Sequence, residues 1–104
     1  MEYRGTSWGE KGVKDWSVYL LRCADGTLYC GTSTDVARRV AMHNGFLAGG
    51  ARYTRGRRPV SLLASAGGMT RQEALRFERL IKRLPRTRKL DALLHRSVSV
   101  LPKK

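Results

Sequence analysis

A short hairpin at the start of the periodic region is the feature that most limits the architecture of this 104-residue chain. Side chains alternate in character from Trp16 to Cys23, which is typical of a β-strand. The segment Ala24–Gly26 follows as a turn, and residues 27–31 predict the return strand. A chain of this length therefore has room for one small sheet and a single modest core.

The length of that turn decides on which faces of the hairpin Tyr19 and Tyr29 lie. A two-residue loop at Asp25-Gly26 would place the two phenol rings on opposite faces. A three-residue loop with a left-handed Gly26 would set Tyr19 opposite Gly31, and both rings would share one face. We predict the second register, because a joint site for both phenols requires it.

A helix is predicted directly after the hairpin. Thr34 is suited to cap a helix that starts at Asp35, and the Asn-Gly pair at 44–45 is suited to end it. Arg39 and His43 are spaced i to i+4, so they share one face of this helix. The guanidinium would suit bidentate contact with a phosphate. The imidazole could also merely favour the negative end of the helix dipole.

The charge balance points to a polyanionic partner. Lys and Arg number 21 against 8 acidic residues, which gives a formal net charge of +13. Phosphates would relieve this self-repulsion, so nucleic acid is the predicted partner. No apolar run could span a bilayer and no signal peptide is evident, so we expect a cytoplasmic protein with no membrane partner.

The segment 44–59 combines glycines, arginines and a tyrosine, which predicts a flexible loop that tracks phosphates and stacks a base. A merely solubilising loop would explain the charge but not the interleaved tyrosine. Arg38, on the preceding helix, is expected mainly as a solvated charge. The candidate nucleic-acid contacts are Arg38, Arg52, Tyr53, Arg55, Arg57 and Arg58.

The second half of the chain predicts one strand and two helices. An apolar run at 60–66, after Pro59 and before Gly67-Gly68, indicates the third strand. Thr70 and Glu73 fit a capping box, and the helix that they open should end before Pro85. A last helix at 87–95 should turn three leucines inward, namely Leu90, Leu93 and Leu94.

Glu78 lies at the border of the apolar face of the penultimate helix, which carries Ala74 and Ile81. A carboxylate in that position is costly unless it is paired or bound to a cation. An ion pair with Lys82 or Arg71 and a bound cation both satisfy this need, and the helix pattern leaves the two alternatives open.

Cys23 and Cys30 are the only cysteines, and both lie in strand-like apolar runs. We interpret them as small core residues. A zinc site that adds His43 and His95 is the less favoured alternative.

The predicted organisation is a flexible arm at 1–15, one domain at 16–96 and a basic tail at 97–104. The predicted fold class is α/β in the α+β sense. It has a small three-stranded, mainly antiparallel sheet flanked by about three helices.

Several of these residues together resemble the GIY-YIG nuclease domain over about Trp16 to Leu84. The resemblance rests on Ser17-Val18-Tyr19, Tyr29-Cys30-Gly31, Arg39, His43 and Glu78. In length the chain is similar to stand-alone, YhbQ-like members, and its motifs also resemble the catalytic subunit of Slx-type structure-specific endonucleases. Ser17 and Cys30 depart from the usual motif residues, at positions where no chemistry is expected.

The resemblance implies a metal-dependent endonuclease that hydrolyses nucleic-acid phosphodiesters, DNA rather than RNA, in repair or recombination. One Mg²⁺ or Mn²⁺ would be held mainly by Glu78 and water, with no small-molecule cofactor. Tyr19 would be the base, Tyr29 would hold the water or phosphate in line, and Arg39 would balance charge. His43 would orient a tyrosine, relay its proton or itself be the base.

Two alternatives remain at this level. One is a nucleic-acid-binding module that keeps this fold without cleavage, and the other is a basic structural protein. The pattern does not separate DNA from RNA, or flap from nick from single strand, as substrate, because phosphate contacts carry no sequence information. It leaves a monomer and a homodimer equally open.

Overall fold

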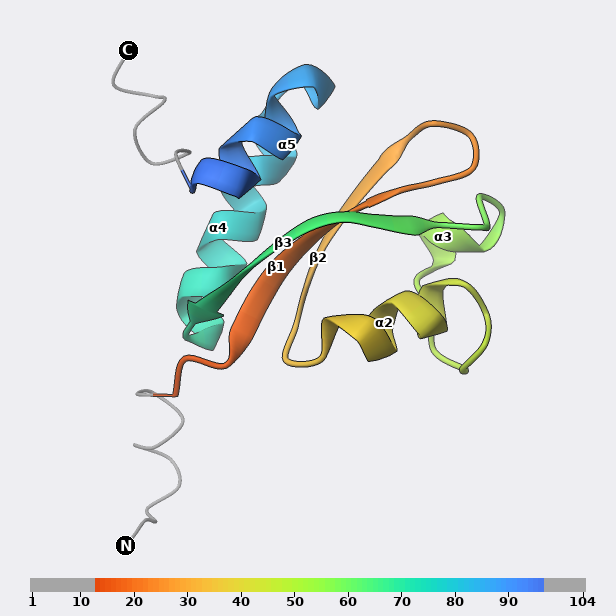
Figure 1. Ribbon diagram of the computed structural model, residues 1–104, viewed down its shortest axis with the longest axis horizontal. Coiled ribbons are helices and arrows are strands. Elements are labelled where there is room, and N and C mark those ends of the chain that lie inside the picture. Colours follow the sequence, from red (N-terminus) through yellow and green to blue (C-terminus); the bar gives the residue numbers. More distant parts are fainter. Residues whose placement is uncertain (1–12, 97–104) are drawn as a thin grey trace, which may run out of the picture.

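The computed structural model describes residues 13–96, which form a three-stranded antiparallel sheet with four helices (Figure 1). The strands are β1 (Trp16–Arg22), β2 (Leu28–Ser33) and β3 (Ser61–Met69), in the spatial order β2-β1-β3. The helices are α2 (Val36–His43), α3 (Arg52–Arg55), α4 (Arg71–Arg83) and α5 (Arg86–His95). The predicted α+β class is confirmed. The expected tail at 97–104 and most of the expected arm at 1–15 lie outside the described residues.

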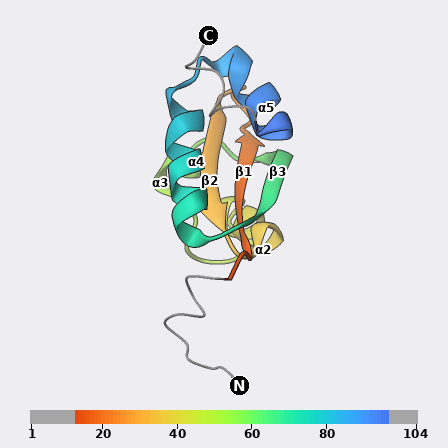
Figure 2. The same cartoon turned by 90° about the vertical axis from the view of Figure 1, so that its left-hand side faces the viewer.

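The sheet separates two apolar clusters, because successive side chains of a strand point to opposite faces. Val18 and Leu20 of β1 are fully buried in the cluster covered by α4 and α5. Tyr19 and Leu21 belong to a second cluster, together with Cys23 and Val60. Val36 and Val40 of α2 pack against this cluster, as does Tyr29. Figure 1 shows the two helix pairs on opposite sides of the sheet, and in Figure 2 α4 runs alongside β2.

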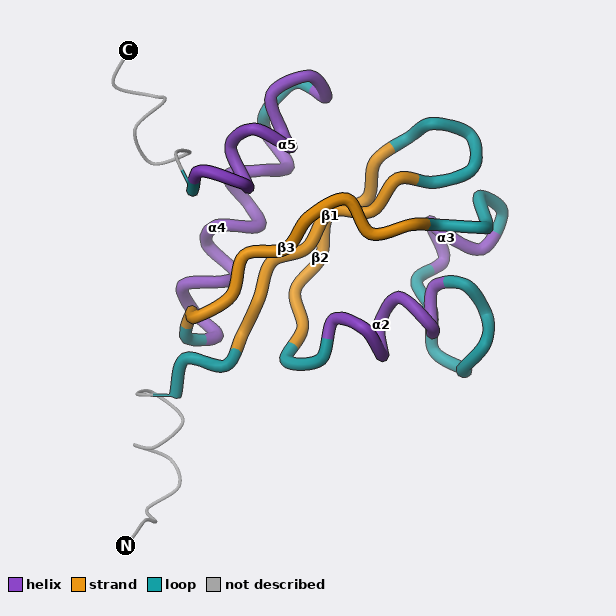
Figure 3. Tube along the Cα trace, viewed as in Figure 1, coloured by secondary structure: helices purple, strands orange, loops and turns teal. Residues whose placement is uncertain are grey.

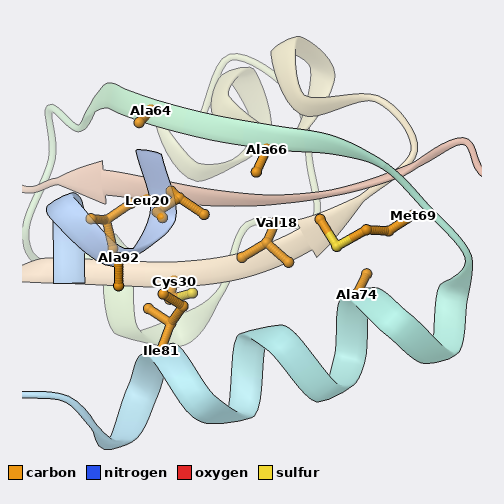
Figure 4. Packing of buried hydrophobic residues seen from close by; sticks show 10 residues of the cluster. Val18, Leu20, Cys30, Ala64, Ala66, Met69, Ala74, Ile81 and Ala92 are labelled. Carbon is orange, nitrogen blue, oxygen red and sulfur yellow. The ribbon is translucent and has the colours of Figure 1, made fainter. Parts of the chain in front are cut away.

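The larger cluster contains the predicted inward face of α4. Ala74 and Ile81 are fully buried, and Phe77 and Leu84 pack against the cluster in part. Figure 4 shows Ile81 and Ala74 pointing toward the sheet, near Cys30 and Val18. The predicted capping box is also present, since Thr70 accepts from the Glu73 amide and Glu73 accepts from the Thr70 amide.

The hairpin has the predicted register. Tyr19 is the partner of Gly31, and the Cys23 amide donates to the Thr27 carbonyl at 2.8 Å. Gly26 has a φ of +86°, the left-handed conformation that a three-residue loop requires. Tyr19 and Tyr29 therefore lie on the same face, the one that α2 covers. Figure 3 shows this turn at the same end of the molecule as α3.

The predicted end of the third strand was wrong, because β3 continues through Gly67 and Gly68 to Met69. The pairing with β1 shifts between Val18, opposite Ala66, and Trp16, opposite Met69. Gly68 has a φ of +76°, so the glycines form an irregularity within the strand. Pairing then resumes beyond it.

The predicted N-cap of α2 was wrong by one residue. Asp35, and not Thr34, caps the helix, and its carboxylate accepts from the Arg38 amide at 3.1 Å. Ser33 accepts from the Asp35 amide at 2.8 Å and so fixes the cap. The carboxylate is the stronger acceptor for the open amides of the first turn.

The predicted end of α2 at Asn44-Gly45 is confirmed. Gly45 has a φ of +84°, and its amide donates to the Met42 carbonyl at 3.0 Å. The Phe46 amide donates to the Ala41 carbonyl at 2.9 Å, which completes a Schellman motif.

Two further expectations were wrong. The segment 44–59 is not only loop, because it contains the short helix α3. Leu94 is 59 % exposed, whereas its neighbour Leu93 is fully buried. The buried face of α5 carries Ala92 and Leu93, so Leu94, one step further around the helix, turns toward solvent.

Candidate active site

Three aromatic side chains from three elements meet on the face of the sheet that α2 covers. The phenol oxygen of Tyr19 lies 2.8 Å from Nε2 of His43. The Tyr29 ring centroid lies 4.9 Å from that of His43 and 6.4 Å from that of Tyr19. The hairpin register and the C-terminal end of α2 thus bring together three residues that the sequence predicted as one site.

Gly31 makes this arrangement possible. A Cβ atom at this position would lie 2.5 Å from the Tyr19 oxygen and 2.7 Å from the ring carbon that bears it. Real Cβ atoms do not approach other atoms this closely, so the phenol occupies the space above β2 only because residue 31 has no side chain.

A buried polar chain continues from His43. Its Nδ1 lies 3.0 Å from Oγ1 of Thr54, whose hydroxyl lies 2.9 Å from the Ala51 carbonyl. The side chains of His43 and Thr54 have no exposed surface. Sequence reasoning missed Thr54, because α3 has only four residues and offers no periodicity from which to predict a buried hydroxyl.

Burial controls the protonation of Tyr19 and His43. It raises the pKa of Tyr19 to about 12, although the guanidinium of Arg39 acts in the opposite direction. Burial also lowers the pKa of His43 to about 4, and the positive charges of Arg39 and Arg58 add to the effect. At neutral pH the phenol therefore carries its proton and the imidazole is neutral.

Arg39 reaches this cluster from one turn earlier in α2, as the spacing predicted. Its Nη1 donates to the Gly49 carbonyl at 3.0 Å, so the glycine-rich segment holds the guanidinium. Arg38 is exposed, in agreement with its expected role as a solvated charge.

Two of the loop arginines make internal contacts. Arg57 pairs with Asp25 at 3.0 Å, donates to the Tyr53 carbonyl at 2.8 Å and lies 4.0 Å from the centre of the Tyr53 ring. Arg58 donates to the His43 carbonyl at 2.7 Å. Tyr53 is 38 % exposed, and its ring centroid lies 5.7 Å from that of Tyr29.

Arg52 and Arg55, in contrast, are exposed on α3. The loop is therefore tied to the turn at Asp25 and to the aromatic cluster, and it presents two arginines to solvent.

Glu78 comes from the other side of the sheet. It forms an ion pair with Lys82 at 3.0 Å, so one of the two predicted ion-pair alternatives is present. Arg71, the other predicted partner, lies 5.7 Å from the Trp16 ring instead. The Glu78 side chain is only 17 % exposed, and its hydrogen bond is the main cause that raises the pKa of Lys82.

The zinc alternative finds no support. Cys23 and Cys30 are both buried and free, but they belong to clusters on opposite faces of the sheet. Among residues 13–96 no group of three His, Cys, Asp or Glu side chains is placed to hold a metal ion. In the same range no helix is long and apolar enough to cross a membrane.

Comparison with known proteins assigns the family. The model of the GIY-YIG catalytic domain matches residues 15–91. The chain belongs to the GIY-YIG nuclease family. A UPF0213 protein of Nitratidesulfovibrio vulgaris is 54 % identical over 83 residues, which cover 80 % of this chain and 74 % of that protein. A UPF0213 protein of Halobacterium salinarum is 50 % identical over 72 residues, which cover 69 % and 91 % of the two chains.

A solved structure agrees with this family. The solution NMR structure of a protein from E. faecalis is 34 % identical and matches with a TM-score of 0.53, covering 80 % of this chain and 86 % of that one. The predicted resemblance to the stand-alone members of the family is therefore confirmed.

Proposed function

We propose that this GIY-YIG protein is a metal-dependent endonuclease that hydrolyses nucleic-acid phosphodiesters. The observation that carries the proposal is the convergence of Tyr19, Tyr29 and His43 on one face of the sheet, with Arg39 beside them. Phenol, imidazole and guanidinium groups together can manage a proton and the charge of a phosphate. The net charge of +13 suits a polyanionic substrate.

We further propose DNA as the preferred substrate, in single-stranded or branched form, with a role in repair or recombination. The exposed arginines of α3 lie on the same side of the sheet as the aromatic cluster and suit a flexible or distorted backbone. They offer contacts to phosphates and no reading of the base sequence.

Burial favours a division of labour between the two phenols that differs from the sequence expectation. Tyr19 is 1 % exposed, whereas Tyr29 is half-buried and so more accessible to a water molecule. Burial also raises the pKa of Tyr19 to about 12, so at neutral pH very little of it is the phenolate that could take a proton from water. We therefore assign contact with the attacking water to Tyr29 and a positioning role to Tyr19.

The resulting step is a hydrolysis. The Tyr29 oxygen takes a proton from the attacking water as its own phenol proton passes to solvent, and the hydroxide oxygen bonds to phosphorus. The bond from phosphorus to the leaving oxygen breaks, and that oxygen takes up a proton from solvent. Arg39 binds the phosphate and compensates the charge that develops on its oxygens.

Glu78 fits a hard divalent cation. A half-buried carboxylate can supply one oxygen ligand to Mg²⁺ or Mn²⁺, which keep several water ligands in such sites. The ammonium of Lys82 now neutralises this carboxylate, and a cation would take its place. When bound, the cation would polarise the phosphate and stabilise the leaving oxygen.

One assay tests the proposal. Labelled single-stranded, duplex and branched DNA, with RNA in parallel, are incubated with Mg²⁺ or Mn²⁺ and either wild type or Glu78→Gln. We expect wild type to cut and the variant to bind without cutting, while the exposed carboxylate variant Asp91→Asn serves as the matched control. Binding without cutting in either metal would instead support the non-catalytic binding module. Neither binding nor cutting would leave only the basic structural protein.

A further inference from the structure

Thr54 is a buried hydroxyl that the proposed reaction does not use. It lies on α3 with no exposed surface, and its Oγ1 is 3.0 Å from Nδ1 of His43. Buried polar groups are normally satisfied, so the direction of each hydrogen bond in this chain can be assigned from its partners.

The Ala51 end of the chain fixes the first direction. A carbonyl oxygen only accepts, so the Thr54 hydroxyl donates its single hydrogen to Ala51 at 2.9 Å. Toward His43 the Thr54 oxygen is then an acceptor, and Nδ1 of the imidazole must carry the hydrogen.

The other end of the chain gives the same direction. A neutral imidazole has one ring hydrogen, so Nε2 of His43 is unprotonated and the Tyr19 phenol donates to it at 2.8 Å. The charge of the Arg39 guanidinium acts on the Tyr19 phenol, and this side chain has only donors. If Nε2 of His43 carried the ring hydrogen instead, the Tyr19 oxygen would accept it. The phenol hydrogen would then have to turn away from His43, toward the donors of Arg39.

The surroundings of His43 hold it neutral. Arg39 and Arg58 carry the charges that act on it, and both oppose a second ring proton. The Ala51 amide donates toward Nδ1, which favours the opposite tautomer. At 3.4 Å this contact is longer, and so weaker, than the 3.0 Å contact with Thr54.

We propose that Thr54 is a positioning residue that fixes the Nδ1-protonated tautomer of His43, so that the Tyr19 phenol donates its hydrogen to His43. Through this chain a hydroxyl on α3 orients the phenol of Tyr19 within the aromatic cluster. The catalytic part of the inference rests on the proposed nuclease function, whereas the tautomer does not.

The tautomer of His43 can be measured without an activity assay. The chain has two histidines, His43 and His95, so nitrogen-15 NMR of the full-length protein gives two resolvable imidazoles. At neutral pH we expect a protonated Nδ1 and an unprotonated Nε2 for His43. A wild-type His43 protonated at Nε2 would overturn the proposal.

Variants test the role of the hydroxyl. Thr54→Val removes the acceptor and should shift His43 toward the Nε2-protonated form, whereas Thr54→Ser should keep the wild-type tautomer. Thr87→Val, on the exposed surface of α5, is the control. If folded Thr54→Val keeps the wild-type tautomer, Thr54 does not fix it and the proposal is wrong. If this variant does not fold, the wild-type and Thr54→Ser spectra still test the proposal.

The kinetic arm separates this inference from the proposed function. Removing the partner that orients a metal-ligating histidine typically lowers activity by about 10- to 100-fold. We expect a loss of the same order in kcat for Thr54→Val, with rescue by Thr54→Ser. Cleavage that is equal in all three proteins would refute the positioning role while leaving the nuclease intact. If the wild type does not cleave, the proposed nuclease function is wrong, and the NMR result alone then tests the tautomer.

Discussion

At the scale of single residues, His43 determines how the fold responds to acid. Its pKa is lowered to about 4 in the folded protein, mainly by burial, against about 6.5 in the unfolded chain. Between these values the unfolded state binds more protons, so stability is fully present above about pH 6.5 and is lost as pH falls toward about 4. The full loss is on the order of 3 kcal/mol.

This acid sensitivity can be measured by urea unfolding at several pH values. We expect the unfolding free energy of wild type to fall between about pH 6.5 and about pH 4. His43→Gln should flatten the curve in this window, and His95→Gln, which alters an exposed histidine, should not. Equal slopes for wild type and His43→Gln would show that other groups cause the loss.

The sequence predicted part of the site at this scale. Tyr19, Tyr29, Arg39 and His43 were predictable because their spacing follows strand and helix periods. Thr54 was not, since its neighbours along the chain carry no pattern and its partner lies 11 residues away. Only the packing of α3 against the end of α2 makes its hydroxyl significant.

At the scale of secondary-structure elements, the Glu78–Lys82 pair on α4 is where the proposed cation would compete with a side-chain charge. The ammonium lies 3.0 Å from the carboxylate that we assign to the metal. A cation must displace this charge, and therefore Lys82→Met should bind Mn²⁺ more tightly, by a few-fold for a partly exposed pair.

The measurement is a Mn²⁺ titration followed by electron paramagnetic resonance. Arg79→Met is the matched control, because it removes one positive charge from an exposed position on the same helix. Equal tightening in both variants would mean that net charge alone acts, and no tightening in Lys82→Met would argue against Glu78 as the ligand.

Elements were predictable where a single residue type decides the geometry. Gly26 fixed the hairpin register, and Thr70 with Glu73 fixed the start of α4. The end of β3 was missed because adjacent glycines usually break a strand, whereas pairing with β1 continues past Gly68. Which of Thr34 and Asp35 caps α2 depends on the contact with Ser33, which local preference does not encode.

At the scale of the whole molecule, the fold class followed from the number and order of the elements. The sequence did not reveal that the sheet separates the aromatic cluster from α4, so that the helix carrying Glu78 lies on the opposite side of the sheet. That placement depends on how β2, at the edge of the sheet, packs against both layers.

The same two-sided architecture predicts where nucleic acid binds. If the α2 and α3 side is the interface, the double variant Arg52→Gln, Arg55→Gln should lose about two phosphate contacts on single-stranded DNA. The plot of log affinity against log salt would then flatten by about 0.7 per contact. Arg83→Gln, Arg88→Gln removes the same charge from exposed positions on α4 and α5 and should leave the slope nearly unchanged. If the slope flattens equally in both double variants, DNA affinity depends only on the total charge. If it flattens in the second double variant alone, the interface lies on the other face of the sheet.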